Sequence, residues 1–183
     1  MAMISLDSLM GNQGPNYPEQ VVAPYRKELA DAGFQQLTTT EEVGQLFTNN
    51  PGKVILLVLN SVCGCSARVS RPGAILSFFN HAVPDIKASL FAGMEKEAVA
   101  HFRANYLQGI TPSSPNIIVL KDRQVLLHLQ RHQIETSDAG TIADALIEVY
   151  NQHCTKKTTE EEREDLRAYF KQVYQVDPLA TQE

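Results

Sequence analysis

Two cysteines separated by a single glycine are the residues in this sequence best suited to chemistry. Cys63-Gly64-Cys65 follows an apolar run and precedes a stretch with helical character. At such a junction, free backbone N–H groups and the positive end of the helix dipole face Cys63, and both favour a thiolate. The pattern predicts a redox dithiol in which Cys63 attacks and Cys65 is the second cysteine.

The residues around the pair support the same interpretation. Arg68 and Arg71 lie one and two helical turns further on, and no acidic residue occurs between positions 50 and 84, so nothing nearby in the sequence opposes a thiolate. A disulfide across Gly64 closes a very small ring. We expect this ring to be strained and easily reduced, which suits thiol exchange or isomerisation.

Other interpretations of the pair remain open. Cys63 and Cys65 could supply two thiolates to Zn or Cu(I), with Cys154 or His153 as a third ligand. A closed zinc site needs four ligands, and the chain offers no second paired segment, so no metal site is assigned. The cysteines could also fill a core, or serve a redox-sensing interaction protein. Cys154 itself is expected to be half-buried at a helix end and dispensable for chemistry.

The elements that must position the motif alternate between strand and helix. The run 53–59 has no polar alternation, which is typical of a central strand covered on both faces. Further strands are expected at 86–91, 116–120 and 125–130, the last two joined by a tight turn at 121–124. Helices are expected over 18–33, after a capping box at Thr39 and Glu42, over 63–80 with a kink at Pro72-Gly73, over 95–107, over 138–152, and after a capping box at Thr158 and Glu161.

This order predicts an α/β fold. A mixed sheet with helices on both faces is the thioredoxin-like arrangement, here with N-terminal helices and a C-terminal helical extension. The expected division is a flexible N-terminus at 1–17, the thioredoxin-like domain at 18–154 and the extension at 155–183. In proteins of this fold, a cis-proline before a central strand faces the active cysteine. Ser114-Pro115 occupies that position, so we expect a cis bond beside Cys63 that presents backbone groups to substrate.

Composition limits the class of protein. The 183 residues are 43% hydrophobic and 20% charged, as in a globular domain, and the net charge of −5 argues against a general nucleic-acid binder. No apolar run approaches the ~18 residues of a membrane span, and no secretory signal is recognisable at the start. Three cysteines are too few for a disulfide scaffold. These features favour a cytoplasmic protein.

Several separate motifs together resemble the bacilliredoxin family, whose thioredoxin-like members carry a Cys-Gly-Cys active site. The resemblance covers about 18–154 and rests on these segments: 60–65, 71–73, 91–93, 96–98, 112–115 and 131–135. It implies a thiol–disulfide oxidoreductase that removes bacillithiol, or a similar small thiol, from protein cysteines, with disulfide-isomerase character. It implies no tightly bound cofactor, S-thiolated proteins as partners, and Cys63 as the attacking residue. A homodimer is compatible with it, and it says nothing about the extension.

Overall fold

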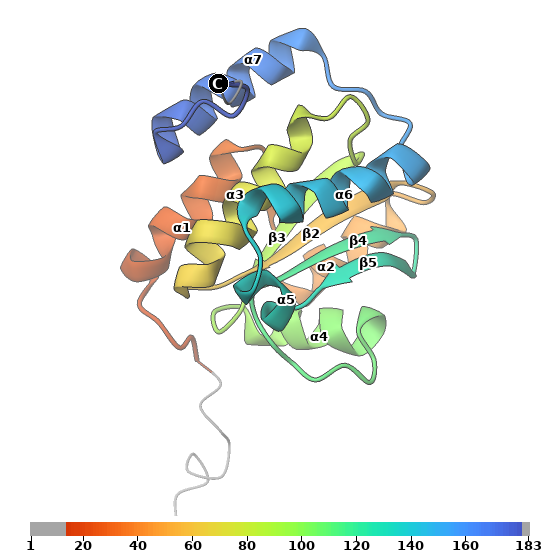
Figure 1. The fold of residues 1–183 in the computed structure, drawn as a ribbon. Coiled ribbons are helices and arrows are strands. Elements are labelled where there is room, and N and C mark those ends of the chain that lie inside the picture. Colours follow the sequence, from red (N-terminus) through yellow and green to blue (C-terminus); the bar gives the residue numbers. More distant parts are fainter. Residues whose placement is uncertain (1–13, 181–183) are drawn as a thin grey trace, which may run out of the picture.

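The computed structural model describes residues 14–180, and these form a five-stranded mixed sheet between two layers of helices (Figure 1). The strand order is β1-β3-β2-β4-β5. The strands are β1 (Gln35–Gln36), β2 (Val54–Asn60), β3 (Ile86–Phe91), β4 (Asn116–Lys121) and β5 (Gln124–Leu129). The predicted thioredoxin-like α/β arrangement is confirmed. The predicted N-terminal segment 1–17 falls largely outside the described residues.

β2 occupies the centre of the sheet because its side chains serve two cores. It pairs in parallel with β3 and antiparallel with β4, and every one of its residues is buried. Leu56 and Val58 belong to the core on one face, whereas Ile55 and Leu57 belong to the core on the other. Two buried faces require apolar residues at every position, which explains the continuous apolar run in the sequence.

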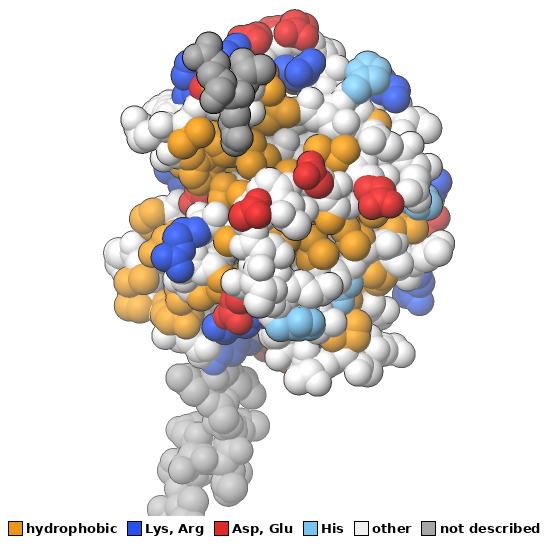
Figure 2. All heavy atoms as spheres, viewed as in Figure 1, with side chains coloured by type: hydrophobic (Ala, Val, Ile, Leu, Met, Phe, Trp, Pro, Cys, Tyr) orange, Lys and Arg blue, Asp and Glu red, His pale blue; other side chains and the backbone are white. Residues whose placement is uncertain are grey.

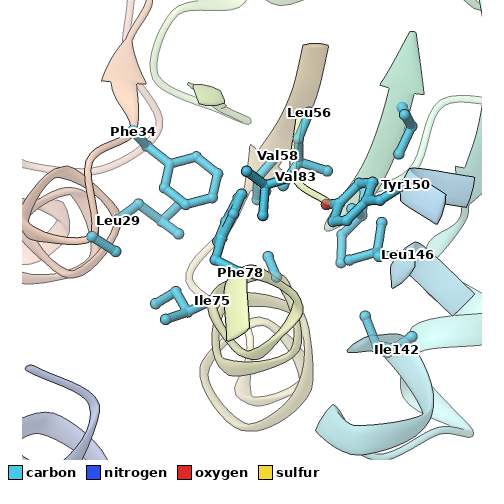
Figure 3. Close-up of a cluster of buried hydrophobic side chains, with 14 of the residues drawn as sticks. Leu29, Phe34, Leu56, Val58, Ile75, Phe78, Val83, Ile142, Leu146 and Tyr150 are labelled. Carbon is cyan, nitrogen blue, oxygen red and sulfur yellow. The ribbon is translucent and has the colours of Figure 1, made fainter. Parts of the chain in front are cut away.

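The helices divide between the two faces of the sheet. α2 (Thr40–Thr48) and α4 (Lys96–Tyr106) contribute to one core. α1 (Glu19–Asp31), α3 (Arg71–Leu76), α6 (Ala139–His153) and α7 (Glu160–Tyr174) contribute to the other. Figure 3 shows this second core, where Phe78 lies between Phe34 and Tyr150 beneath β2. Here helices from both ends of the chain meet over the strand that leads to the cysteines.

The segment after the cysteines is a continuous helical stretch that combines π-helix, α-helix and 3₁₀-helix. A π-helical segment, η2 (Ser66–Ser70), leads into α3 and then into a 3₁₀ turn, η3 (Ser77–Phe79). The sequence predicted an interruption at Pro72-Gly73. The irregularity instead lies just before Arg71, where the wider π-helical turn replaces regular helix. Such π segments are often found at functional sites.

Some predicted details were wrong or missing. The last capping box uses Thr159 and Glu162, one residue later than predicted, because the hydroxyl of Thr158 bonds the carbonyl oxygen of Asn80 instead. The short strand β1 and the short helix α5 (Arg131–Glu135) were not anticipated. α1 begins at Glu19 and continues through Pro24. The capping box at Thr39 is confirmed, and of the two residues that could cap the helix over 138–152, Ser137 and Asp138, the cap is Asp138.

The C-terminal extension packs onto the domain. Phe170 of α7 is buried and meets Phe79 edge to face, with 6.3 Å between ring centres. Ahead of α7, the backbone N–H of Val83 donates to the carbonyl oxygen of Lys156 over 3.1 Å. The extension therefore completes one face of the core.

Lys87 of β3 lines a cavity of about 260 Å³ between the sheet and α7. Its ammonium group donates to the carbonyl oxygen of Ala32 over 2.8 Å and lies 4.3 Å from the ring centre of Phe78. Burial, with a smaller contribution from the positive charge of Lys156, lowers the pKa of Lys87 to about 8.

The free energy of unfolding should depend on Lys87 in alkaline solution. An unfolded lysine keeps its proton to about pH 10.4. Between about pH 8 and 10 the unfolded state therefore binds more protons, and the free energy of unfolding rises with pH. We expect Lys87→Met to lower this slope, by up to about 1.4 kcal/mol per pH unit, in urea titrations across that range. The exposed Lys27, replaced in the same way, is the control. Equal slopes for wild type and Lys87→Met would contradict the expectation.

Candidate functional site

The cysteine pair lies at the carboxyl end of the central strand. β2 ends at Asn60, two residues cross the edge of the sheet, and Cys63 precedes the first helical residue, Gly64. Cys63 and Cys65 form a disulfide and are both partly exposed. The structure thus joins the two thiols that the sequence singled out, at an accessible edge of a rigid sheet.

The sulfur of Cys63 accepts two hydrogen bonds. The backbone N–H of Ser66 donates to it over 3.2 Å, and the hydroxyl of Ser61 donates over 3.3 Å. The N–H groups of Ser66 and Ala67 also reach the carbonyl oxygen of Cys63, at 3.1 and 3.3 Å. Cys63 therefore acts as the cap of the following helix, with its sulfur in the place of a capping oxygen. Donors at these distances would stabilise a thiolate there.

The sulfur of Cys65 has a different environment. A carboxylate oxygen of Glu135, from α5, lies 3.9 Å from it, and Glu135 is itself paired with Arg131 over 2.5 Å. No acidic residue lies near the pair along the chain, but the fold brings Glu135 to it from 70 residues away, on α5. A carboxylate opposes a thiolate at Cys65. The surroundings of the two sulfurs therefore favour Cys63 as the nucleophile.

The supporting residues differ in their roles. The guanidinium of Arg68 lies over the motif, since a β-carbon added at Gly64 would be 3.4 Å from its Nη2. Arg71 was expected to add positive charge as a neighbour in the helix. It is instead 1% exposed, and its Nε donates to the carboxylate of Glu28 over 2.7 Å. Arg71 is an internal part of the site, and its charge is offset by Glu28.

Arg71 ties the loop before the motif to the helix after it. Its Nη1 donates to the side-chain oxygen of Asn60 at 3.1 Å, the carbonyl oxygen of Ser61 at 3.3 Å and the hydroxyl oxygen of Ser66 at 3.1 Å. Asn60 and Ser66 are buried, and the Ser66 hydroxyl also donates to Asn60 over 3.0 Å. A buried hydrogen-bond network of this kind fixes the backbone that carries Cys63.

The Ser114–Pro115 bond is cis, as predicted. Asn116 of β4 pairs with Leu59 of β2, so Pro115 meets the sheet edge at which the cysteines emerge. The side-chain amide of Asn116 donates to the carbonyl oxygen of Pro115 over 2.6 Å and to the hydroxyl of Ser113 over 3.1 Å. The proximity of Pro115 to the Cys63 sulfur, and the binding of substrate by Ser114 and Pro115, stay predictions.

Two residues that the sequence did not single out hold this loop. Arg103 of α4 donates to the carbonyl oxygen of Ser113. His128 of β5 shares a hydrogen bond of 3.2 Å between its Nε2 and the side-chain oxygen of Asn116. Burial, with a smaller contribution from Arg103, lowers the pKa of His128. Both residues reach the loop from other elements of the fold, so no local sequence motif predicts their contacts with it.

Cys154 lies at the other end of the sheet. It is the C-cap residue of α6, and it is buried, whereas the sequence predicted a half-buried residue. Burial, followed by the charge of Asp85, raises the pKa of its thiol to about 11. Asp85 bonds Val54 at the start of β2, whereas Cys63 follows the end of that strand, about 20 Å away at 3.3 Å per residue. Cys154 and the adjacent His153 are therefore too distant to complete a metal site with the motif.

The possible metal-ligating side chains of residues 14–180 are dispersed. Within that range no three His, Cys, Asp or Glu side chains come together as possible ligands. Within it, too, no helix is long and apolar enough to cross a membrane.

A groove of about 610 Å³ runs beside the motif, between the helical stretch after the cysteines and the C-terminal extension. One wall includes Ala67 and Arg68, and the other includes Phe170, Tyr174 and Val176. In Figure 2, hydrophobic side chains surround the hollow at the upper left, near the position of α7 in Figure 1. The extension therefore shapes one approach to the cysteines.

Comparison with known proteins gives a consistent result. The family model described as disulphide isomerase matches residues 17–154. A bacilliredoxin of Cytophaga hutchinsonii is 45% identical over 136 residues, which are 74% of this chain and 98% of that protein. A bacilliredoxin of Halalkalibacterium halodurans is 40% identical over 139 residues, 76% of this chain and 95% of that protein. The extension lies outside the family match.

The same comparison extends to solved structures. Fasciola hepatica thioredoxin aligns with 64% of this chain and 99% of its own, at a TM-score of 0.43 and 16% identity. At that similarity the fold assignment depends on the chain's own strand order and helix layers.

Proposed function

This chain belongs to the bacilliredoxin family, and on that basis we propose that it is a thiol–disulfide oxidoreductase that releases bacillithiol, or a similar small thiol, from protein cysteines. The observation that supports this most is the contrast between the two sulfurs. Cys63 accepts hydrogen bonds from Ser61 and Ser66, whereas Cys65 faces Glu135. The surroundings of Cys63 suit the attacking thiol, and those of Cys65 suit the thiol that reacts second.

The proposed reaction consists of two exchanges. The thiolate of Cys63 attacks the small-thiol sulfur of a mixed disulfide, and the protein cysteine leaves as a thiolate that takes a proton from solvent. Cys65 then attacks the sulfur of Cys63, closes the Cys63–Cys65 disulfide and expels the small thiol. Two electrons pass from the dithiol to the substrate, and no bound cofactor is required. An external thiol or dithiol reductant restores the pair.

The remaining residues would bind the substrate. S-thiolated proteins are the proposed partners, and the loop carrying Ser114 and Pro115 would offer backbone groups to an extended substrate segment. Arg68 would contribute positive charge beside Gly64. We also propose a cytoplasmic location, where reducing conditions keep the dithiol available.

A model protein carrying bacillithiol on a single cysteine provides the test. The reduced enzyme is expected to release the small thiol, measured by mass spectrometry, and to release bacillithiol faster than glutathione from the matched substrate. If the enzyme releases the small thiol from neither substrate, the proposal is wrong. Disulfide isomerisation is a second activity suggested by the family description, and recovery of a scrambled disulfide protein measures it separately.

Replacement of Cys154 by serine should leave this reaction unchanged. Cys154 lies at the end of the sheet where β2 starts, whereas the pair follows the other end of that strand, which is about 20 Å long. Substitutions at such a distance act independently, so the rate should stay within about twofold of wild type. The rate of thiol release by the folded variant checks this. A large loss of rate with retained circular dichroism would show that Cys154 takes part as a third redox thiol.

A further inference from the structure

The C-terminal extension reaches the site through Glu28 of α1. Figure 1 shows α7 lying along the helical layer that includes α1 and α3. The hydroxyl of Tyr174 donates to one carboxylate oxygen of Glu28, and the hydroxyl of Tyr169 donates to the backbone carbonyl oxygen of the same residue over 2.6 Å. Two tyrosines of α7 therefore hold one residue of α1, one by its charged side chain and one by its backbone.

Glu28 passes this contact to Arg71. Its second carboxylate oxygen accepts from the Nε of Arg71 over 2.7 Å, and the two side chains are 14% and 1% exposed. Within residues 14–180, Glu28 is the carboxylate that forms an ion pair with Arg71. The guanidinium carbon of Arg71 also lies 4.8 Å from the ring centre of Tyr25, a side chain without a negative charge. Glu28 thus determines how far the charge of Arg71 is offset.

Arg71 in turn holds both residues that donate to the sulfur of Cys63. Its Nη1 binds the carbonyl oxygen of Ser61 and the hydroxyl oxygen of Ser66. The hydroxyl of Ser61 and the N–H of Ser66 are the donors 3.3 and 3.2 Å from that sulfur. Each link from α7 to Cys63 is therefore a hydrogen bond between described residues.

From this chain of contacts we propose that the C-terminal helix tunes the nucleophile, through Tyr174 and Glu28, by fixing how much of the charge of Arg71 acts on Cys63. The extension lies outside the family match at 17–154, so this is a property of this chain in addition to the family's shared domain. The inference rests on the proposed function for the role of Cys63. Glu28 and Tyr174 are positioning residues, since neither contacts the sulfur.

Other charges near the pair belong to different elements. Glu135 and Arg131 of α5 lie on the side of Cys65, and Arg68 lies over Gly64. These groups stay unchanged when Glu28 or Tyr174 is replaced. A change in the ionisation of Cys63 in such variants would therefore report the charge of Arg71.

The test measures the pH dependence of iodoacetamide alkylation at Cys63. It uses the full-length chain with Cys65 and Cys154 replaced by serine, so that one thiol reacts. Glu28→Gln keeps an acceptor for Arg71 but removes the negative charge. We expect the midpoint of the alkylation profile to move to lower pH by about one unit, the size expected for one charge at this range in a partly buried site.

Two tyrosine variants separate charge tuning from simple docking of the helix. Tyr174→Phe removes the hydroxyl that binds the carboxylate, so Glu28 leaves Arg71 part of the time. The midpoint should fall by less than in Glu28→Gln, which corresponds to an increase of about two- to threefold in the acid dissociation constant of Cys63. Tyr169→Phe is the matched control, because its hydroxyl donates to the backbone carbonyl oxygen of Glu28 and not to the carboxylate. We expect the wild-type midpoint for that variant.

The outcomes decide the inference independently of the proposed function. Wild-type midpoints in folded Glu28→Gln and Tyr174→Phe proteins would overturn it, and so would equal shifts in the two tyrosine variants. If Glu28→Gln fails to fold, the tyrosine pair alone decides. Alkylation needs no substrate, so a shift in these variants would stand even if the enzyme released no small thiol from a mixed disulfide.

Discussion

Replacement of Cys63 by serine is expected to abolish release of a small thiol from a mixed disulfide, with a loss of about a thousandfold or more, as when other catalytic nucleophiles are removed. A serine hydroxyl does not ionise near neutral pH, so the donors from Ser61 and Ser66 have no anion to stabilise. We expect Cys65 not to take over the attack, because the carboxylate of Glu135 next to its sulfur disfavours a thiolate there. Release of the small thiol, followed by mass spectrometry, measures the effect.

The control for this variant is the same chemical change elsewhere. Cys154→Ser also exchanges sulfur for oxygen, but in a buried position at the far end of the sheet. It controls for the general effect of losing a thiol. A Cys63→Ser protein that stays folded and keeps full activity would show that the roles of the two motif cysteines are assigned wrongly.

The sequence predicted the parts of this fold that depend on local pattern. The apolar run 53–59 indicated a two-sided central strand, and β2 has this character because two cores meet on it. The position of the Cys-Gly-Cys motif between a strand and a helix indicated that free backbone N–H groups face Cys63, and the N–H of Ser66 does donate to its sulfur. The box at 158–161 was placed one residue early, because the pairs Thr158–Glu161 and Thr159–Glu162 both satisfy the pattern. Only tertiary contact with Asn80 distinguishes them.

The remaining features of the site depend on contacts between distant segments. Glu28 and Arg71 are 43 residues apart, and Cys65 and Glu135 are 70 apart. No spacing rule relates such residues, so the sequence could name Arg71 without showing that it is buried and paired. A charged side chain is rarely buried without a partner. The sequence therefore contained the charged residues of the site but not the pairing that determines what each of them does.

Replacement of Cys65 by serine is expected to stop the reaction after its first step. Cys63 keeps its two donors in this variant, so it should still attack the mixed disulfide and displace the protein thiol. The second exchange needs a thiol next to the Cys63 sulfur, and Cys65 is the residue joined to it in the oxidised protein. Without Cys65, the small thiol should stay on Cys63 in close to one equivalent, until an external thiol removes it.

Intact-mass analysis after one addition of substrate, with peptide mapping of the adduct to Cys63, measures this product. The doubly substituted protein, with Cys63 and Cys65 both serine, is the control and should carry no adduct. The lifetime of the adduct also tests the part given to Cys65, because wild-type protein should pass rapidly to the internal disulfide and hold the small thiol only briefly. The opposite pattern, an adduct on Cys65 in Cys63→Ser and none in Cys65→Ser, would reverse the two roles. The hydrogen bonds from Ser61 and Ser66 would then stabilise the resting disulfide and would not activate a nucleophile.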